Sequence, residues 1–93
     1  MNAVPEIRPE MQPRVSRRFR LQWEDAQQAW VLLYPEGMVK LNQSAGEILK
    51  RCDGVRSVDE LVADLEQAFG TTGLQPDVIA FLAMARQQHW VEI

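Results

Sequence analysis

The sequence predicts an α+β fold in which an N-terminal three-stranded antiparallel β-meander is followed by three α-helices. Two hydrophobic periods carry this prediction. Residues 19–24 alternate apolar and polar side chains, which is typical of a strand with one buried face. From residue 45 onward, apolar residues recur three and four positions apart, which is typical of helices. With 93 residues, of which 46% are hydrophobic and 25% charged, the chain has room for one small globular domain.

Three strands are expected in the first half of the chain. Residues 19–23 form the first, and the continuous apolar run at 29–34 forms the second, with both faces largely covered. Pro-Glu-Gly at 35–37 predicts a tight turn, and residues 38–41 form a third short strand. This order is the simplest antiparallel meander.

Three helices are expected in the second half. The first is capped by Asn42 or Ser44 and ends near Gly54. The second begins with a capping box at Ser57 and ends in the glycine-containing segment 70–73. The third opens at Pro76 and runs to about residue 88. Residues 90–93 alternate again and leave open a short C-terminal strand, so that the whole arrangement is winged helix-turn-helix-like.

Residues 1–13 are expected to form a flexible N-terminal arm. Pro5, Pro9 and Pro13 interrupt them, and they show no apolar periodicity. Because proline fixes φ and removes a backbone donor, we expect this arm to be extended and to stay outside the core. Residues 14–93 then form a single domain.

The charge distribution argues against a nucleic-acid-binding domain. Residues 1–20 carry five arginines against two acids, whereas residues 21–93 carry five cations against eleven acids. The expected third helix offers only Arg86 as a cation, and the second helix is acidic, although phosphate neutralisation dominates DNA affinity. The longest apolar run, residues 78–85, is too short to span a membrane, and no signal-peptide core is present, so we expect a cytoplasmic protein.

The sequence predicts no enzymatic activity. His89 is the sole histidine and has no neighbouring acid or thiol that would suggest a triad, and Cys52 falls on an apolar helix stripe as a buried structural thiol. The acids at 59–66 are interpreted as a solvated helix face. No glycine-rich phosphate loop and no metal-ligand spacing occurs, so we expect neither metal nor cofactor.

A peptide-binding groove is the remaining hypothesis. The third helix is apolar around nearly its whole circumference, which leaves a second face at Phe81, Met84 and Ala85 without a partner in so small a core. The short strand at 38–42 would present unpaired backbone groups that another chain can complete by strand addition. The alternative is that this edge is paired within the fold or covered by the helix.

The chain also resembles the coenzyme PQQ synthesis protein D (PqqD) family. Five segments match in order and spacing, and together they span most of the expected domain: residues 30–37, 41–45, 48–54, 57–61 and 78–82. The resemblance implies a non-catalytic chaperone with a winged-helix-like fold. It also implies binding of the precursor peptide PqqA, which the chaperone presents to the radical S-adenosylmethionine enzyme PqqE during pyrroloquinoline quinone biosynthesis.

The resemblance further implies where the peptide lies. In this family the peptide adds as a strand beside the third strand and packs against the third helix. Carried onto this sequence, the peptide-binding residues are Met38, Val39, Lys40 and Leu41 on the strand and Phe81, Met84, Ala85 and Gln88 on the helix. Periodicity leaves open whether Val39 and Leu41 or Met38 and Lys40 point into the groove.

Two alternatives from other classes stay open at this point. One is a nucleic-acid-binding winged-helix protein, whose binding would weaken steeply with salt. The other is a self-associating structural protein, a homodimer joined by pairing of the same sheet edge or by strand exchange.

Overall fold

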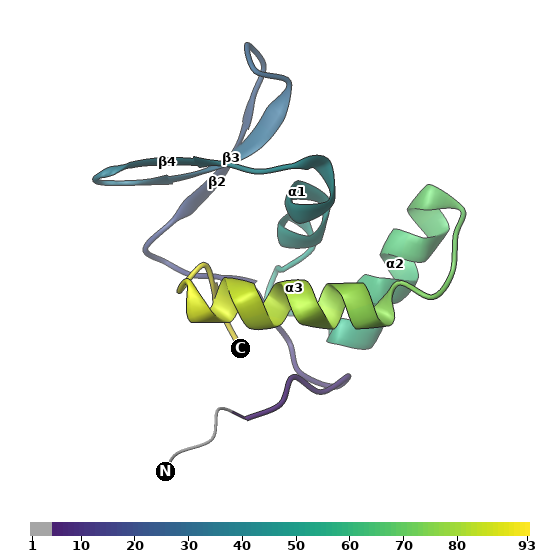
Figure 1. Ribbon diagram of the computed structural model, residues 1–93. Coiled ribbons are helices and arrows are strands. Elements are labelled where there is room, and N and C mark those ends of the chain that lie inside the picture. The colour runs from purple at the N-terminus through teal and green to yellow at the C-terminus, as the bar shows by residue number, and fades with distance from the viewer. Residues whose placement is uncertain (1–4) are drawn as a thin grey trace.

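A computed structural model describes residues 5–93. Its elements confirm the predicted class, with three strands in a meander, three helices and a short C-terminal strand (Figure 1). In chain order these are β1 (Arg14–Val15), β2 (Arg20–Glu24), β3 (Ala29–Tyr34), β4 (Gly37–Lys40), α1 (Gln43–Lys50), α2 (Val58–Phe69), α3 (Gln75–Gln87) and β5 (Val91–Glu92).

The main sheet has the order β2-β3-β4, and both of its pairings are antiparallel. Leu32 lies opposite Leu21 on one side and Val39 on the other, and all three contribute to the core. Because cross-strand partners share a face, the same face carries Trp30 and Tyr34, two residues away along β3. The helices cover this core face.

The helix ends agree with the predicted signals in part. Asn42, rather than Ser44, caps α1 and accepts a hydrogen bond from the backbone N–H of Ala45 at 2.8 Å. Ser57 and Glu60 form the predicted capping box at the start of α2. Gly70 ends α2 in the left-handed conformation with φ of 61°, which glycine adopts without steric cost.

A second, two-stranded sheet joins the two ends of the domain. β1 pairs antiparallel with β5, so that Val15 lies opposite Val91. The C-terminal strand was an open expectation, but β1 was not predicted, because a two-residue strand shows no alternation that a sequence pattern can reveal. Arg14 donates two hydrogen bonds to Glu92 across this pair.

The expectation that residues 1–13 stay outside the core is wrong for their second half. Ile7 is only 8% exposed and belongs to the hydrophobic core, and Pro13 is also buried. We call residues 7–13 the N-terminal strap. Residues 1–4 of the predicted arm lie outside the described residues.

The N-terminal strap completes the first turn of α2. The carbonyl of Met11 accepts the N–H of Val58 at 2.8 Å, and the carbonyl of Pro9 accepts the N–H of Asp59 at 3.1 Å. Proline removes a donor but keeps its carbonyl, and acceptors are what the first turn of a helix lacks. The prolines, which led to the prediction of a flexible arm, are therefore compatible with a segment that accepts hydrogen bonds from the first turn of α2.

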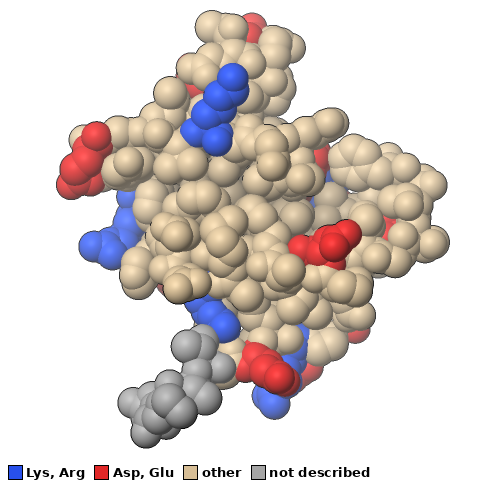
Figure 2. Space-filling model, in the orientation of Figure 1, with Lys and Arg blue, Asp and Glu red and all other residues tan. Residues whose placement is uncertain are grey.

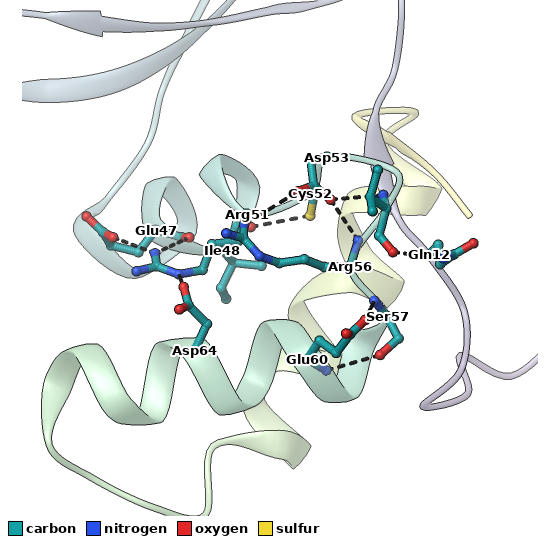
Figure 3. A network of polar contacts seen from close by, with 11 residues as sticks. Gln12, Glu47, Ile48, Arg51, Cys52, Asp53, Arg56, Ser57, Glu60 and Asp64 are labelled. Carbon is teal, nitrogen blue, oxygen red and sulfur yellow. Dashed lines mark hydrogen bonds and ion pairs between the residues drawn. The ribbon is translucent and has the colours of Figure 1, made fainter.

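A buried arginine ties α1 to α2 (Figure 3). Arg51 donates to the carboxylate and the carbonyl of Glu47 on α1, and its Nε donates to Asp64 on α2. Asp64 lies on the predicted solvated face, with its side chain 43% exposed, and pairs there with Arg51. The prediction is wrong for Glu66, which is half-buried and accepts the N–H of Leu74 at 3.0 Å, and so holds the start of α3 against the end of α2.

Candidate functional site

The free edge of β4 offers backbone hydrogen-bonding groups to a further strand. Leu41 donates to the carbonyl of Trp30 at 3.0 Å, so this pair is hydrogen-bonded, and the register makes Val39 with Leu32 the next such pair. The N–H and C=O groups of the intervening residues, Met38 and Lys40, therefore point away from β3. Among the described strands, none lies on that side of β4.

One helical stripe of α3 faces this region. Asp77, Phe81, Met84 and Gln88 are spaced four, three and four residues apart, so they fall on one line along the helix surface. Phe81 is half-buried, Met84 is 38% exposed and Gln88 is exposed. We call these four residues the α3 stripe.

Two surface hollows lie at the two ends of the α3 stripe. One, of about 480 Å³, joins Gln43 and Ser44 of α1 to Asp77 and Phe81 of the stripe. The other, of about 440 Å³, contains the β3–β4 turn at 35–36 and the opposite end of α3.

β4 runs between those two hollows in the sequence. In the ribbon, β4 and α3 run in opposite chain directions (Figure 1). The first hollow is apolar, because Ile48, Leu65, Phe69, Leu74, Val78 and Phe81 contribute to its lining.

The structure assigns directions to the eight predicted site residues. Val39 and Leu41 lie on the core face of the sheet, Val39 half-buried and Leu41 only 5% exposed. Met38 and Lys40 lie on the opposite face and are exposed, with Met38 at 45%. The side chains thus alternate across β4, and the sequence had left open which of the two pairs lies on the core face.

One residue of the predicted second helix face does not belong there. Ala85 is fully buried, because it continues the core stripe of α3 with Val78 and Leu82 at helical spacing. The prediction of an uncovered face was therefore wrong for Ala85, whereas Phe81, Met84 and Gln88 keep the surface position that it required. Phe81 also packs its ring against Trp90, with centroids 6.5 Å apart.

The surface over α3 carries few charges. Figure 2 shows this side of the molecule as mostly uncharged, with Lys, Arg, Asp and Glu concentrated around its rim. A broad uncharged area suits contact with apolar peptide side chains and offers little attraction for phosphates.

The chemistry of the described residues gives no catalytic constellation. Burial raises the pKa of the Cys52 thiol to about 12, and that thiol donates to the carbonyl of Ile48, so Cys52 is a structural residue. His89 is exposed and has a positive φ of 65° after α3. Within residues 5–93, no group of three His, Cys, Asp or Glu side chains is arranged to hold a metal ion. No helix in that range is long and apolar enough to cross a membrane.

Comparison with known proteins decides the family. The model of the family described as coenzyme PQQ synthesis protein D (PqqD) matches residues 29–91, which include β4, the α3 stripe and the whole lining of the apolar hollow. The chain belongs to the PqqD family. The resemblance drawn from the sequence is thereby confirmed.

Relatives and solved structures agree with this assignment. The PqqA binding protein of Stutzerimonas stutzeri is 47% identical over 91 residues, covering 97% of this chain and 99% of that protein. The PqqA binding protein of Pseudomonas aeruginosa PAO1 is 54% identical over 82 residues, covering 87% of this chain and 89% of that protein.

Two PqqD structures share the fold. The solution structure of the PqqD part of Methylobacterium extorquens PqqCD, described as a stand-alone RiPP recognition element, gives a TM-score of 0.72 at 29% identity. It covers 87% of this chain and 88% of that one. PqqD from Xanthomonas campestris gives 0.57 at 26% identity, covering 99% and 96%.

One feature of the site, the apolar hollow, was not predicted from the sequence. This hollow between the helices depends on Leu65 and Phe69 of α2. Phe69 is in fact 48% exposed, because α2 extends past the body of the domain. This end of α2 lines the hollow because of the way α2 packs against α1 and α3, and the hydrophobic periodicity of one helix does not predict how it packs against another.

Proposed function

We propose that this chain is a non-catalytic cytoplasmic peptide chaperone of pyrroloquinoline quinone biosynthesis. It binds the precursor peptide PqqA by addition of a strand to β4, and the N-terminal strap completes the peptide-binding domain of residues 14–93. The observation that carries the proposal is the free edge of β4, where the backbone groups of Met38 and Lys40 point outward. The names of the relatives as PqqA binding proteins support the choice of peptide.

The register fixes how side chains of the peptide would be distributed. A peptide residue opposite Val39 shares its face and points toward the α3 stripe. Residues opposite Met38 and Lys40 point to the outer face of the sheet. Successive side chains of the peptide would therefore contact two different surfaces in turn, one formed by the helix and one by the outer face of the sheet.

The apolar hollow extends this contact beyond the end of β4. It shares Phe81 with the α3 stripe and begins at Gln43, three residues after the strand ends. The lining of this hollow contains two charged residues, Glu47 and Asp77. An apolar side chain buried there adds about 1.5–3 kcal/mol to binding before entropic costs.

These contributions are sufficient for a useful affinity. A micromolar complex requires about 8 kcal/mol of favourable binding free energy. A few main-chain hydrogen bonds, each worth about 0.5–1.5 kcal/mol net, together with two or three apolar contacts supply a gross free energy of this order, from which the entropic cost of association is subtracted. No cofactor is needed for binding of this kind.

The partner that receives the peptide is, on the same proposal, the radical S-adenosylmethionine enzyme PqqE. The bond-forming chemistry then belongs to that enzyme, and this chain holds and presents the peptide. Strand addition leaves the outward side chains of the peptide at an open sheet edge, where a second protein can reach them. A pull-down of PqqE in the presence and absence of peptide tests this step separately.

A homodimer through β4 is the second candidate, because the same free edge can pair with its twin. It makes a distinct prediction: peptide and dimer compete, so saturating peptide shifts the chain toward a 1:1 complex. Light scattering on a size-exclusion column with and without peptide measures this. The nucleic-acid alternative is disfavoured by the few charges over α3 and by the acids of α2.

The experiment that tests the proposed function is an amide NMR titration with synthetic PqqA. Shifts concentrated on residues 37–41 and on the α3 stripe are expected, with the amides of the β2–β3 hairpin turn at 25–28 as internal controls. Saturable shifts confined to other surfaces would retain peptide binding and reject this site. The absence of any shift at saturating peptide would reject the proposed function itself.

A further inference from the structure

We propose that Lys40 selects an acidic side chain in the bound peptide. The recognised segment then carries Asp or Glu at the position opposite Lys40 and an apolar residue at the adjacent position, opposite Val39. This inference rests on the proposed pairing of the peptide with β4 and specifies the peptide class that the edge accepts.

Lys40 is placed to meet a peptide side chain and has no partner of its own. It is exposed on the outer face of β4, and among the described residues it forms no ion pair. In the register of the sheet its neighbours are Val31 and then Gln22, neither of which is charged. The side-chain amide of Gln22 donates a hydrogen bond to Glu24 at 3.0 Å. Glu24 is the last residue of β2, next to the β2–β3 turn.

The remaining charges of the outer sheet face favour an acidic ligand. Besides Lys40 and Glu24, this face carries Arg20, which lies in the same row as Leu33 and Met38. Arg20 also forms no ion pair with a described residue. The nearest acid at the other end of β4 is Glu36, in the turn at 35–36.

Four other cations in the described chain are paired with carboxylates. Arg8 pairs with Glu10, Arg14 with Glu92 and Arg56 with Asp53, while Arg51 joins two carboxylates. The cations without an ion pair are Arg17, Arg18, Arg20, Lys40, Lys50 and Arg86, and the first four lie in the sheet or directly before it. An acidic peptide strand on β4 would supply the missing carboxylate.

Strand addition converts this placement into selectivity. Side chains directly opposite each other on neighbouring strands approach to about 5 Å, and opposite charges there are favourable whereas like charges are unfavourable. The residue opposite Val39 points to the half-buried side instead, next to the α3 stripe, where an apolar side chain is preferred. The acidic and the apolar positions are adjacent in the peptide whether it runs parallel or antiparallel to β4.

A charge-swap experiment tests the proposal. Binding of synthetic PqqA is measured by calorimetry for the wild-type chain, Lys40→Met and Lys40→Glu, with Lys50→Met as a matched control on α1. Each Asp and Glu of the peptide is replaced singly by Gln and by Lys. We expect Lys40→Glu to weaken binding by about three- to tenfold at low salt. At one acidic position of the peptide, and at no other, replacement by Lys should restore the affinity for Lys40→Glu. Replacement of that same acid by Gln should not change the affinity for Lys40→Met.

The outcomes separate this inference from the function on which it rests. If the wild-type chain binds PqqA and both Lys40 variants bind every peptide equally well, the inference is wrong and the proposed function stands. If Lys40→Met self-associates while its peptide affinity is unchanged, Lys40 protects the edge against pairing with its twin, which also overturns the inference. If the wild-type chain does not bind PqqA, the proposed function fails and this inference fails with it.

Discussion

Gly46 on α1 and Trp30 on β3 approach so closely that a Cβ atom at position 46 would lie 2.7 Å from Cδ1 of Trp30. This contact places α1 against the sheet directly after β4. Trp30 in turn stacks edge-on against Trp23, with ring centroids 5.6 Å apart. The position of α1, the helix that follows β4, therefore depends on the absence of a side chain at residue 46.

Replacement of Gly46 by alanine is expected to destabilise the domain. Alanine favours a helix interior over glycine by about 1 kcal/mol, but the added methyl group must displace Trp30, which costs about 1–3 kcal/mol. Urea unfolding should show a net loss of stability for Gly46→Ala and a smaller loss when Trp30→Leu is combined with it. Gln67→Ala on the exposed face of α2 is the control. A more stable Gly46→Ala chain would show that the contact is looser than described.

The N-terminal strap should contribute to stability through Ile7. Because Ile7 is 8% exposed within the core, Ile7→Ala is expected to cost about 2–4 kcal/mol, whereas Glu6→Ala on the exposed neighbour should cost little. Amide exchange provides a local readout, since the N–H groups of Val58 and Asp59 donate to strap carbonyls. They should exchange faster in Ile7→Ala. Equal amide exchange rates and equal unfolding free energies in the two variants would show that the strap does not stabilise the fold.

Three carboxylates should make the domain sensitive to acid. The pKa of Asp53 is lowered by a hydrogen bond from the backbone N–H of Arg56, that of Asp64 by a hydrogen bond from Arg51, and that of Glu92 by one from Arg14. A lowered folded-state pKa means that the unfolded chain binds protons first. The stabilisation is therefore complete above the ordinary carboxyl range and is lost as the pH falls through the folded-state values.

Urea midpoints measured from about pH 7 to pH 3 check this acid sensitivity. The decline should be shallower in Asp64→Asn than in the wild-type chain. The exposed Asp25→Asn variant, which lies in the β2–β3 hairpin turn, should follow the wild-type curve. Identical slopes for Asp64→Asn and the wild-type chain would contradict the role given to this carboxylate.

Cys52 should be unreactive in the folded chain. Burial raises the pKa of its thiol to about 12, so almost no thiolate exists at neutral pH. An aromatic disulfide reagent at pH 8 should label Cys52 only at the rate of unfolding, and labelling should become immediate in denaturant. A raised thiol pKa also implies that stability falls as the pH rises above the ordinary thiol range, because the unfolded chain then releases its proton first. Rapid labelling under native conditions would mean that this thiol is accessible.

A proline at Met38 should separate peptide binding from folding. The N–H of Met38 points to the free edge, where proline is tolerated in a strand, so Met38→Pro should keep the circular dichroism spectrum of the wild-type chain. It should lose about tenfold or more in affinity for PqqA, because a main-chain bond is removed and the ring obstructs the edge. Met38→Ala, which keeps the N–H, is the control and should lose less. Equal losses in both variants would point to side-chain recognition without strand addition.

Much of the fold was predictable because local signals and tertiary structure agree. Alternation located β2, the Pro-Glu-Gly turn at 35–37 located β4, and the capping box at Ser57 located the start of α2. The strap was mispredicted because its contribution comes from carbonyl groups and from the single side chain of Ile7, and neither produces a periodic pattern. The ion pair of Asp64 with Arg51 was not predicted, because Arg51 follows the end of a different helix.

The candidate site was predictable only in part for a related reason. Periodicity shows which residues of one element share a face, but the direction of that face relative to another element depends on packing. Ala85 joined the core and Met84 did not, although they are adjacent members of the same apolar run. The sheet register then decided the directions of Met38 and Val39, which the sequence left open.

Hydrogen exchange at β4 tests the central claim most directly. The N–H of Val39 is paired with β3, whereas those of Met38 and Lys40 face the free edge. In the free chain, Val39 should therefore be protected and the other two should exchange quickly. Addition of saturating PqqA should protect Met38 and Lys40 and leave Val39 nearly unchanged. Fast exchange of Met38 and Lys40 in a fully bound complex would contradict strand addition at this edge.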